Sequence, residues 1–319
     1  MTLDGQLGSR VAVVFPGQGS QSVGMGKALF DSSPAARRIF EDADLILGFP
    51  LSRLCFGGQP AELDDTWNAQ PAILTVSVAA WHALRERAAA PPISPLVFAG
   101  HSLGQFTALH LAGVLDFPTV LELVRERGRL MKEAGERRPG GMAAVIGLDD
   151  ETLRSVCREA ESEGIISIAN ANCPGQTVIS GEVDALLKAM ELARAAGARR
   201  VTRLGVTIAS HSPLMAGVSA RLNEILDGLP LAEPTVPVVG NVSGAPITTV
   251  ADVRMELSQH LERPVNWTGS VETMIGLGAT TFVEFGPGQV LSGLIRRINR
   301  DVTTLAGDKL ISGEQGLPV

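Results

Sequence analysis

The stretch PLVFAGHSLGQFTALHLA, residues 95–112, decides the fold that this sequence predicts. Its first five residues are apolar and predict a short buried strand, and the residues after Gly104 have helical spacing as far as Gly113. Between them, residues 100–104 (GHSLG) match G-x-S-x-G in the strand–turn–helix context of a nucleophile elbow. Such a turn lifts the hydroxyl of Ser102 above the sheet, with the N–H groups of the next helix aimed toward it. The alternative is a glycine-rich turn whose serine only caps the helix.

Other short apolar segments predict further strands that end at glycine-rich turns. Residues 11–15 (VAVVF) run directly into PGQGSQ at 16–21, and similar transitions occur at 237–241 and 281–288. Continuous apolar strands are typical of a parallel sheet covered on both faces, with ligand-binding loops at its carboxyl edge. The sequence therefore predicts an α/β catalytic domain with a parallel sheet, formed by residues 1–138 and 206–307.

The pattern of elements changes after the breaker RRPGG at residues 137–141. From there the sequence predicts strand, helix, strand, strand, helix and strand, at 142–147, 149–161, 165–170, 176–181, 183–196 and 200–204. This order is typical of a ferredoxin-like fold. We therefore expect an inserted ferredoxin-like subdomain at residues 139–205 and a loosely ordered tail at 308–319.

Composition narrows the class of protein. The chain has 319 residues, 45% of them hydrophobic, with 35 glycines and no tyrosine, which suits a compact α/β protein of two structural units. No apolar run approaches the roughly 20 residues that cross a bilayer, and residues 1–5 lack the features of a secretory signal. The scattered Cys55, Cys157 and Cys173 fit a reducing, cytoplasmic compartment and no zinc site. A net charge of −7 argues against nucleic acid as a partner.

A serine nucleophile requires a base, and histidine is the usual one. The chain has five histidines: His82, His101, His110, His211 and His260. Two of them are expected in the middle of helices, and His101 diverges from its neighbour Ser102. His211 follows an apolar strand and precedes a helix start, which is where a triad-type histidine belongs, so we expect it to be the base rather than a structural residue. His260 is either a helix C-terminal histidine or part of the site.

Arg127 is expected on the apolar face of the helix at 117–134. The apolar stripe of that helix is formed by Val120, Leu123, Val124, Leu130 and Met131. The opposite, solvated face carries Glu122, Arg125, Glu126 and Arg129. An inward-facing arginine is strongly destabilising unless an anion meets it. Two interpretations remain open: a buried pair with a protein carboxylate, or a guanidinium that binds a substrate carboxylate through two parallel hydrogen bonds.

Seven stretches occur in the order and spacing of malonyl-CoA:acyl carrier protein transacylases, which the chain resembles over nearly its whole length. They are 15–21 (FPGQGSQ), 100–104 (GHSLG), 127–128 (RG), 170–176 (NANCPGQ), 210–211 (SH), 264–267 (PVNW) and 284–288 (EFGPG). Together these motifs are highly specific. The resemblance implies an α/β-hydrolase-like large domain that carries a ferredoxin-like small one, in agreement with the order of predicted elements.

The resemblance also implies a Ser–His dyad rather than a full triad, with no cofactor and no metal. Ser102 would attack the malonyl thioester of malonyl-CoA, with His211 as general base and then general acid. The backbone N–H groups of Gln18 and Leu103 would hold the oxyanion. Further residues expected to contact the substrate are Arg127, as a clamp on the malonyl carboxylate, Gln18, His260, Asn172 and Ser210. The acceptor would be a phosphopantetheinylated acyl carrier protein, served by a monomeric enzyme without a membrane partner.

Three positions depart from the family pattern. Gln105 replaces the glutamate that usually follows the elbow, and His260 replaces the glutamine that helps to orient the catalytic histidine. Support through the backbone carbonyl of residue 260 would leave the tautomer of His211 unaffected, whereas support through its side chain would not. Cys173 replaces a serine and is expected to have a packing role.

The sequence leaves the acyl group and the pathway open. Ile208-Ala209-Ser210 matches neither of the two best-known extender patterns of related polyketide acyltransferases, and the small Ser210 leaves room for a methylmalonyl-type group. Fatty-acid and polyketide supply are the same reaction with different carriers. An editing acyl hydrolase shares the fold, but it would not need Arg127 as a carboxylate clamp. A non-catalytic docking module is disfavoured because Ser102, His211 and Arg127 are all present.

Overall fold

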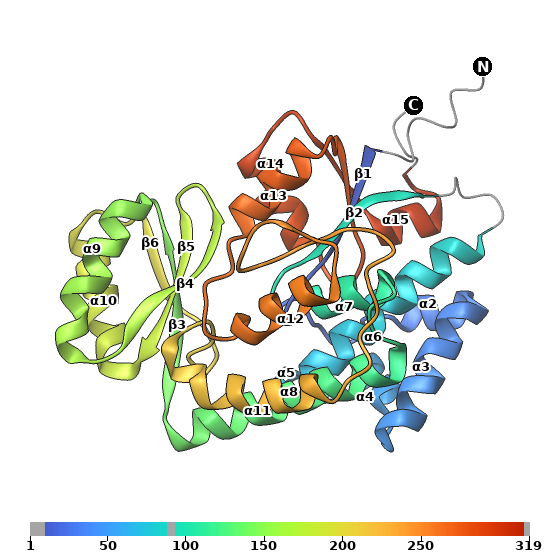
Figure 1. Ribbon diagram of the computed structural model, residues 1–319, viewed down its shortest axis with the longest axis horizontal. Helices are drawn as coiled ribbons and strands as arrows, with labels where there is room; N and C mark the ends of the chain where they lie inside the picture. The colour runs from blue at the N-terminus through green and yellow to red at the C-terminus, as the bar shows by residue number, and fades with distance from the viewer. Residues whose placement is uncertain (1–9, 88–92, 316–319) are drawn as a thin grey trace.

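The computed structural model describes residues 10–87 and 93–315, which form a larger and a smaller unit (Figure 1). The larger unit contains a six-stranded sheet in the order β10-β9-β1-β2-β7-β8. Its strands are β1 (Val11–Phe15), β2 (Pro95–Gly100), β7 (Val238–Val239), β8 (Pro246–Ile247), β9 (Thr281–Glu284) and β10 (Thr303–Ala306). Neighbouring strands are parallel except β7 and β8 at one edge. The predicted α/β class with a mostly parallel sheet is confirmed.

Helices cover both faces of this sheet, which explains why its strands are continuously apolar. Along β1, Val13 and Phe15 belong to the apolar cluster on one face, and Ala12 and Val14 to the cluster on the other. The helices of the larger unit are α2 (Lys27–Ser32), α3 (Pro34–Leu47), α4 (Leu51–Gly57), α5 (Pro60–Asp64), α6 (Thr66–Glu86), α7 (Gly104–Leu111), α8 (Phe117–Arg137), α11 (Ala216–Asp227), α12 (Val250–Gln259), α13 (Trp267–Gly276), α14 (Val290–Ile298) and α15 (Gly307–Ser312). Within the described ranges, none of the helices is long and apolar enough to span a bilayer.

The smaller unit has the predicted ferredoxin-like order of elements. It consists of β3 (Gly140–Ile146), α9 (Asp150–Ala160), β4 (Ile166–Cys173), β5 (Gln176–Glu182), α10 (Val183–Ala195) and β6 (Arg200–Arg203). The four strands pair antiparallel in the order β4-β5-β3-β6, and the two helices pack against one another (Figure 1). The limits 139 and 205 lie just outside these strands and stay a prediction.

The C-terminal segment corrects one expectation. Residues from 308 were expected to be loosely ordered, but α15 covers Gly307–Ser312 and Leu310 is buried against the core. Arg87 Nη1 also donates a hydrogen bond to the carbonyl oxygen of Leu310 at 3.1 Å. Leu310 and its partly buried neighbour Ile311 both pack against this core, although only two of the six residues of α15 are large and apolar. Residues 316–319 lie outside the described ranges.

The elbow lies where β1 and β2 end side by side. Phe15 pairs with Gly100, and the N–H of His101 donates to the carbonyl oxygen of Phe15 at 3.0 Å. A Cβ on Gly100 would lie 1.9 Å from the carbonyl carbon of Gly104, and a Cβ on Gly104 would lie 2.1 Å from the oxygen of Phe15. Both glycines of G-x-S-x-G are therefore required by backbone contacts.

We predict that Gly104→Ala destabilises the protein by about 1–3 kcal/mol or more, because its methyl group meets the backbone of β1, which has no room to move. Urea unfolding measures the effect. The matched control is Gly217→Ala on the exposed side of α11, where an added Cβ meets nothing within 4 Å. That control should stabilise the protein by about 0.4–1 kcal/mol, and equal effects of the two substitutions would contradict the prediction.

Candidate active site

The backbone is in the left-handed region at two side-chain-bearing residues. Of the non-glycine residues that the structure describes, only Ser102 (φ +48°) and His211 (φ +57°) have a positive φ. This conformation costs about 1–3 kcal/mol and persists only where the surrounding structure enforces it, typically at functional sites. Ser102 stands between β2 and α7, and His211 stands between β6 and α11.

These two residues meet as the predicted Ser–His pair. The Oγ of Ser102 lies 2.8 Å from Nε2 of His211, and Nδ1 of His211 lies 3.2 Å from the carbonyl oxygen of Arg263. A carbonyl oxygen only accepts hydrogen bonds, so we assign the ring proton to Nδ1. Nε2 then has a free lone pair for the proton of the serine hydroxyl.

Burial keeps the His211 ring neutral. The side chain is 3% exposed, and desolvation, assisted by the positive charge of Arg127, lowers the pKa of His211 to about 3. A neutral imidazole is the form that accepts a proton from serine, and at this pKa it is the form present throughout the neutral range.

His260 packs against the ring of His211 and does not line the cavity that contains Ser102. Its ring lies edge-on to His211, with 5.8 Å between ring centroids, and edge-on to Phe106 at 5.3 Å. Neither ring nitrogen has a hydrogen-bond partner among the described residues, and burial holds the pKa of His260 well below its usual value. The orientation of His211 thus depends on the carbonyl of Arg263 rather than on the side chain at position 260.

Arg127 is buried without an acidic partner. It is 1% exposed on α8, its Nη1 donates to Oε1 of Gln70 at 2.7 Å, and its Nη2 donates to Oγ of Ser102 at 3.1 Å. No ion pair in the described part of the chain includes Arg127. The alternative of a buried pair with a protein carboxylate is therefore wrong. Burial lowers the pKa of Arg127 to about 9, so the guanidinium is still charged at neutral pH.

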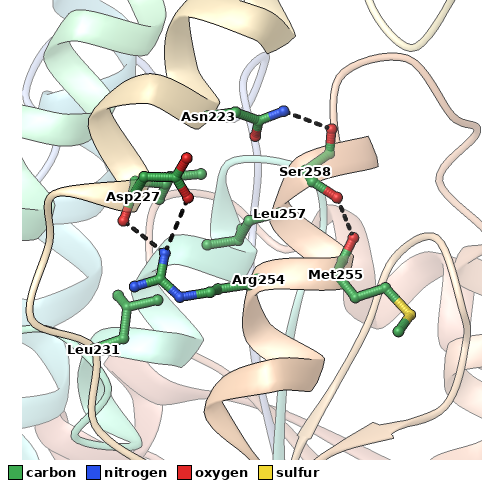
Figure 2. A pocket seen from close by; sticks show the side chains of 8 residues that line it. Asn223, Asp227, Leu231, Arg254, Met255, Leu257 and Ser258 are labelled. Atoms are coloured by element: carbon green, nitrogen blue, oxygen red, sulfur yellow. Dashed lines mark hydrogen bonds and ion pairs between the residues drawn. The ribbon is translucent and has the colours of Figure 1, made fainter.

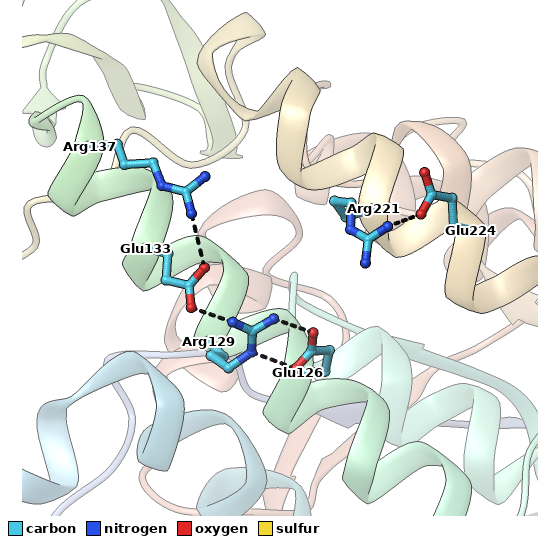
Figure 3. A network of polar contacts seen from close by, with 6 residues as sticks. All are labelled: Glu126, Arg129, Glu133, Arg137, Arg221 and Glu224. Atoms are coloured by element: carbon cyan, nitrogen blue, oxygen red, sulfur yellow. Dashed lines mark hydrogen bonds and ion pairs between the residues drawn. The ribbon is translucent and has the colours of Figure 1, made fainter.

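Arg129 shows how the outer face of the same helix differs. It donates to Glu126 at 2.6 and 2.7 Å and pairs with Glu133, which also contacts Arg137 (Figure 3). These side chains are partly or fully exposed, and two of them, Glu126 and Arg129, belong to the predicted solvated face. Of Arg127, Arg129 and Arg137, only Arg127 is buried and has no carboxylate partner among the described residues.

Ser102, His211 and Arg127 line one cavity of about 380 Å³ that both units border. Met131 and Ile208 come from the larger unit. Met142, on β3, and Leu204, directly after β6, come from the smaller unit. Such a mostly apolar cavity with a few convergent polar groups is typical of a substrate site.

A second cavity, of about 370 Å³, lies between α11 and α12 (Figure 2). In it Arg254 contacts Asp227 at 3.4 Å, and Asn223 Nδ2 donates to the carbonyl oxygen of Ser258 at 3.4 Å. Its lining contains no nucleophile beside a base. Of these two cavities, only the first has a serine hydroxyl beside a histidine ring nitrogen.

Two main-chain N–H groups remain free near the serine. Gln18 lines the cavity in the loop after β1, and Leu103 directly follows Ser102. Within the described ranges, neither N–H has a protein acceptor. The side chain of Gln18 donates to Oγ1 of Thr66 at 2.9 Å, which fixes its loop. Two unsatisfied N–H groups here are what an oxyanion hole needs.

The remaining predicted contact residues divide into two groups. Ser210 lines the cavity, whereas Asn172 and His260 do not; Asn170 lines it instead of Asn172. Asn172 Oδ1 lies 2.8 Å from Nε2 of His101, whose ring packs beside Trp267 with 5.6 Å between centroids. His101 lines the same cavity as Ser102 and His211, but its Nε2 is engaged by Asn172 rather than by either of them.

Two residues of the site are not among those predicted. Gln70, on α6, holds Nη1 of Arg127, and Asn241, after β7, accepts the N–H of Ser102 at 2.6 Å. The position of Asn241 gave a weak indication of a site residue, since it follows Gly240 at the end of a predicted strand. A glycine followed by an asparagine is also common in ordinary turns, so the sequence does not distinguish Asn241 from a turn residue.

The structure shows what surrounds the two other residues that depart from the family pattern, Gln105 and Cys173. Gln105 is fully buried and its Oε1 accepts the N–H of Asn241 at 3.0 Å, so an amide supplies the acceptor without burying a charge. Cys173 is 3% exposed in the apolar cluster with Val265 and Trp267, as expected of a packing residue.

Comparison with known proteins places this geometry in a family. The model of the acyl transferase domain matches residues 12–310. The chain is 44% identical over 299 residues to the malonyl CoA-acyl carrier protein transacylase of Bacillus subtilis, with 93% of each chain covered. The crystal structure of a malonyl-CoA:acyl carrier protein transacylase from Xanthomonas oryzae pv. oryzae superposes with a TM-score of 0.90 at 40% identity, covering 93% of this chain and 94% of that one.

A malonyl-transacylase in complex with a type II polyketide synthase acyl-carrier protein is equally similar. Its TM-score is 0.91 at 38% identity, covering 96% of this chain and all of that one. The family model, the sequence identity and the shared fold agree over nearly the whole chain. The chain therefore belongs to the malonyl-CoA:acyl carrier protein transacylases of the acyl transferase family.

Proposed function

We propose that Ser102, His211 and Arg127 carry out, in this chain, the transfer of a malonyl group from coenzyme A to the phosphopantetheine thiol of an acyl carrier protein. The reaction itself is that of the family to which the chain belongs. The observation that supports these roles most directly is the desolvated Arg127, which has no acidic partner and lies 3.1 Å from the nucleophilic oxygen. A free carboxylate on the acyl group would supply the missing anion.

In the first half-reaction, the oxygen of Ser102 attacks the thioester carbonyl of malonyl-CoA while His211 Nε2 takes the hydroxyl proton. The N–H groups of Gln18 and Leu103 hold the resulting oxyanion. When the tetrahedral intermediate collapses, the C–S bond breaks and the departing thiolate of coenzyme A takes the proton from His211. A malonyl ester of Ser102 remains, with its carboxylate against Arg127.

In the second half-reaction, the phosphopantetheine thiol gives its proton to His211 and the thiolate attacks the ester carbonyl. The same N–H groups hold the second oxyanion, and Ser102 leaves with the proton that His211 returns. Arg127 has an additional effect through the base, because its positive charge lowers the pKa of His211. A bound malonyl carboxylate offsets that charge and makes His211 more basic.

The editing hydrolase is the weaker alternative, since hydrolysis of a stalled acyl chain requires no buried guanidinium. Fatty-acid synthesis and polyketide synthesis would use the same transfer reaction with different carrier proteins. The sequence leaves the choice between a malonyl and a substituted malonyl group open, and cytoplasmic location and a monomeric state stay predictions.

The direct test is mass spectrometry of the intact protein. After mixing with malonyl-CoA, we expect a mass gain of one malonyl group on Ser102, which a holo acyl carrier protein then removes as malonyl carrier protein. Ser102→Ala should show neither event. Rapid release of free malonate without loading of the carrier would contradict the transferase and favour the hydrolase.

Arg127→Ala should slow acylation by malonyl-CoA about 10²-fold, as expected for the loss of a buried charged hydrogen-bond pair, and acylation by acetyl-CoA less than about threefold. Acylation rates with the two thioesters measure the difference. The control is Arg129→Ala on the exposed face of α8, which should change neither rate by more than about twofold, because exposed ion pairs contribute little. Equal losses on both thioesters in Arg127→Ala would mean a structural arginine.

His260→Gln should retain the rate of acylation by malonyl-CoA within about threefold of the wild type, since His211 is oriented by the carbonyl of Arg263.

The same variant also tests whether the buried His260 makes the stability of the protein depend on pH. Because burial lowers the pKa of His260 in the folded protein, the unfolded chain binds more protons below about pH 6.5, and stability falls as the pH falls. Removing this group should flatten the loss of unfolding free energy between pH 6 and 4.5 by up to about 1.4 kcal/mol per pH unit. An unchanged slope in urea titrations would contradict the assignment.

A further inference from the structure

The Asn241 side chain bridges the two sides of the nucleophilic turn. Its Oδ1 accepts the N–H of Ser102 at 2.6 Å, and its Nδ2 donates to the carbonyl oxygen of Gly100 at 2.7 Å. The residue is 1% exposed, and buried hydrogen bonds of this kind are costly to leave unmade. One amide therefore ties together the residues just before and at the sharpest point of the chain.

The main chain of Asn241 is fixed as firmly as its side chain. Its N–H donates to Oε1 of Gln105 at 3.0 Å, and its carbonyl oxygen accepts the N–H of Asn266 at 2.7 Å. The next N–H, from Val242, donates to the buried carboxylate of Glu256 at 2.7 Å. Both main-chain groups and both side-chain polar atoms of Asn241 thus have a hydrogen-bond partner, so its amide cannot rotate without breaking a buried hydrogen bond.

We propose that Asn241 is a positioning residue that holds Ser102 in its left-handed conformation, so that Oγ lies within reach of both His211 and Arg127. A serine leaves that conformation unless its neighbours oppose the change. Asn241 opposes it by fixing the N–H of Ser102 relative to the end of β2. The inference rests on the proposed role of Ser102 as nucleophile.

This arrangement also limits which N–H groups can form the oxyanion hole. The N–H of Ser102 is already donated to Asn241, so it does not point at a substrate oxygen. The oxyanion donors are then the N–H groups of Leu103 and Gln18.

The side chain at position 241 must donate one hydrogen bond to Gly100 and accept one from Ser102. A variant whose side chain gains its donor only when protonated therefore tests the proposal through the pH dependence of the acylation rate. Asn241→Ala removes both groups. Asn241→Asp keeps the acceptor but lacks the donor when it is ionised, and its carboxylate then faces the carbonyl of Gly100. On protonation the introduced carboxyl again carries one donor and one acceptor with the shape of asparagine.

The experiment measures the rate at which malonyl-CoA acylates Ser102, by mass spectrometry of quenched samples from pH 5 to 8, relative to the wild type at each pH. We expect Asn241→Ala to be about 10²-fold slower throughout, the effect of a small misplacement of reacting groups. Asn241→Asp should be about as slow at pH 8 and recover at least tenfold toward pH 5. Thermal unfolding establishes that each variant is folded. The control is Asn223→Ala, which removes a hydrogen bond to Ser258 outside the lining of the Ser102 cavity and should match the wild type within about twofold.

The outcomes separate the two proposals. Failure of the wild type to become acylated on Ser102 would overturn the proposed function. Normal acylation of the wild type together with folded Asn241 variants within threefold of its rate would overturn only the role of Asn241. A deficit of Asn241→Asp that does not change with pH would also overturn it. Loss of the folded state in both variants at every pH would do the same, since Asn241 would then stabilise the fold rather than place the serine.

Discussion

The left-handed backbone of Ser102, held between the end of β2 and the start of α7, is the constraint on which the rest of the site depends. In this conformation Oγ of Ser102 stands 2.8 Å from Nε2 of His211 and 3.1 Å from Nη2 of Arg127. The turn is possible because Gly104 lies directly against the backbone of Phe15, where any Cβ would clash. That contact brings the loop after β1 to the serine, so the strand pairing that closes the turn also delivers the N–H of Gln18.

Desolvation in one cavity accounts for both the neutral histidine and the charged arginine that the proposed function requires. Burial lowers the pKa of His211 to about 3 and that of Arg127 to about 9, so at neutral pH the histidine is neutral while the arginine remains charged. A buried charge without a partner is unfavourable in the free protein, and a carboxylate on the substrate relieves it. The cavity therefore favours an acyl group that carries its own negative charge.

Each of the three departures from the family pattern is accommodated by its surroundings. His211 is oriented by the carbonyl of Arg263, so a histidine at position 260 needs only to fill space beside Phe106. Gln105 supplies the oxygen that Asn241 requires, and Cys173 fills an apolar contact with Trp267. In each case the requirement is an acceptor or a volume, which more than one residue type meets.

The sequence by itself determined the secondary-structure elements and the residues proposed to react. Apolar runs, glycine positions and helical spacing predict the parallel sheet, the inserted unit, Ser102, His211 and the inward face of Arg127, because these are properties of neighbours along the chain. Only the tertiary structure decided which groups meet across distances of many residues. The partner of Arg127, the carbonyl that orients His211 and the clamp of Asn241 come from α6, the segment after α12 and the end of β7. Such contacts depend on how strands and helices pack, and a glutamine, a backbone carbonyl or an asparagine in a turn leaves no periodic signal in the sequence.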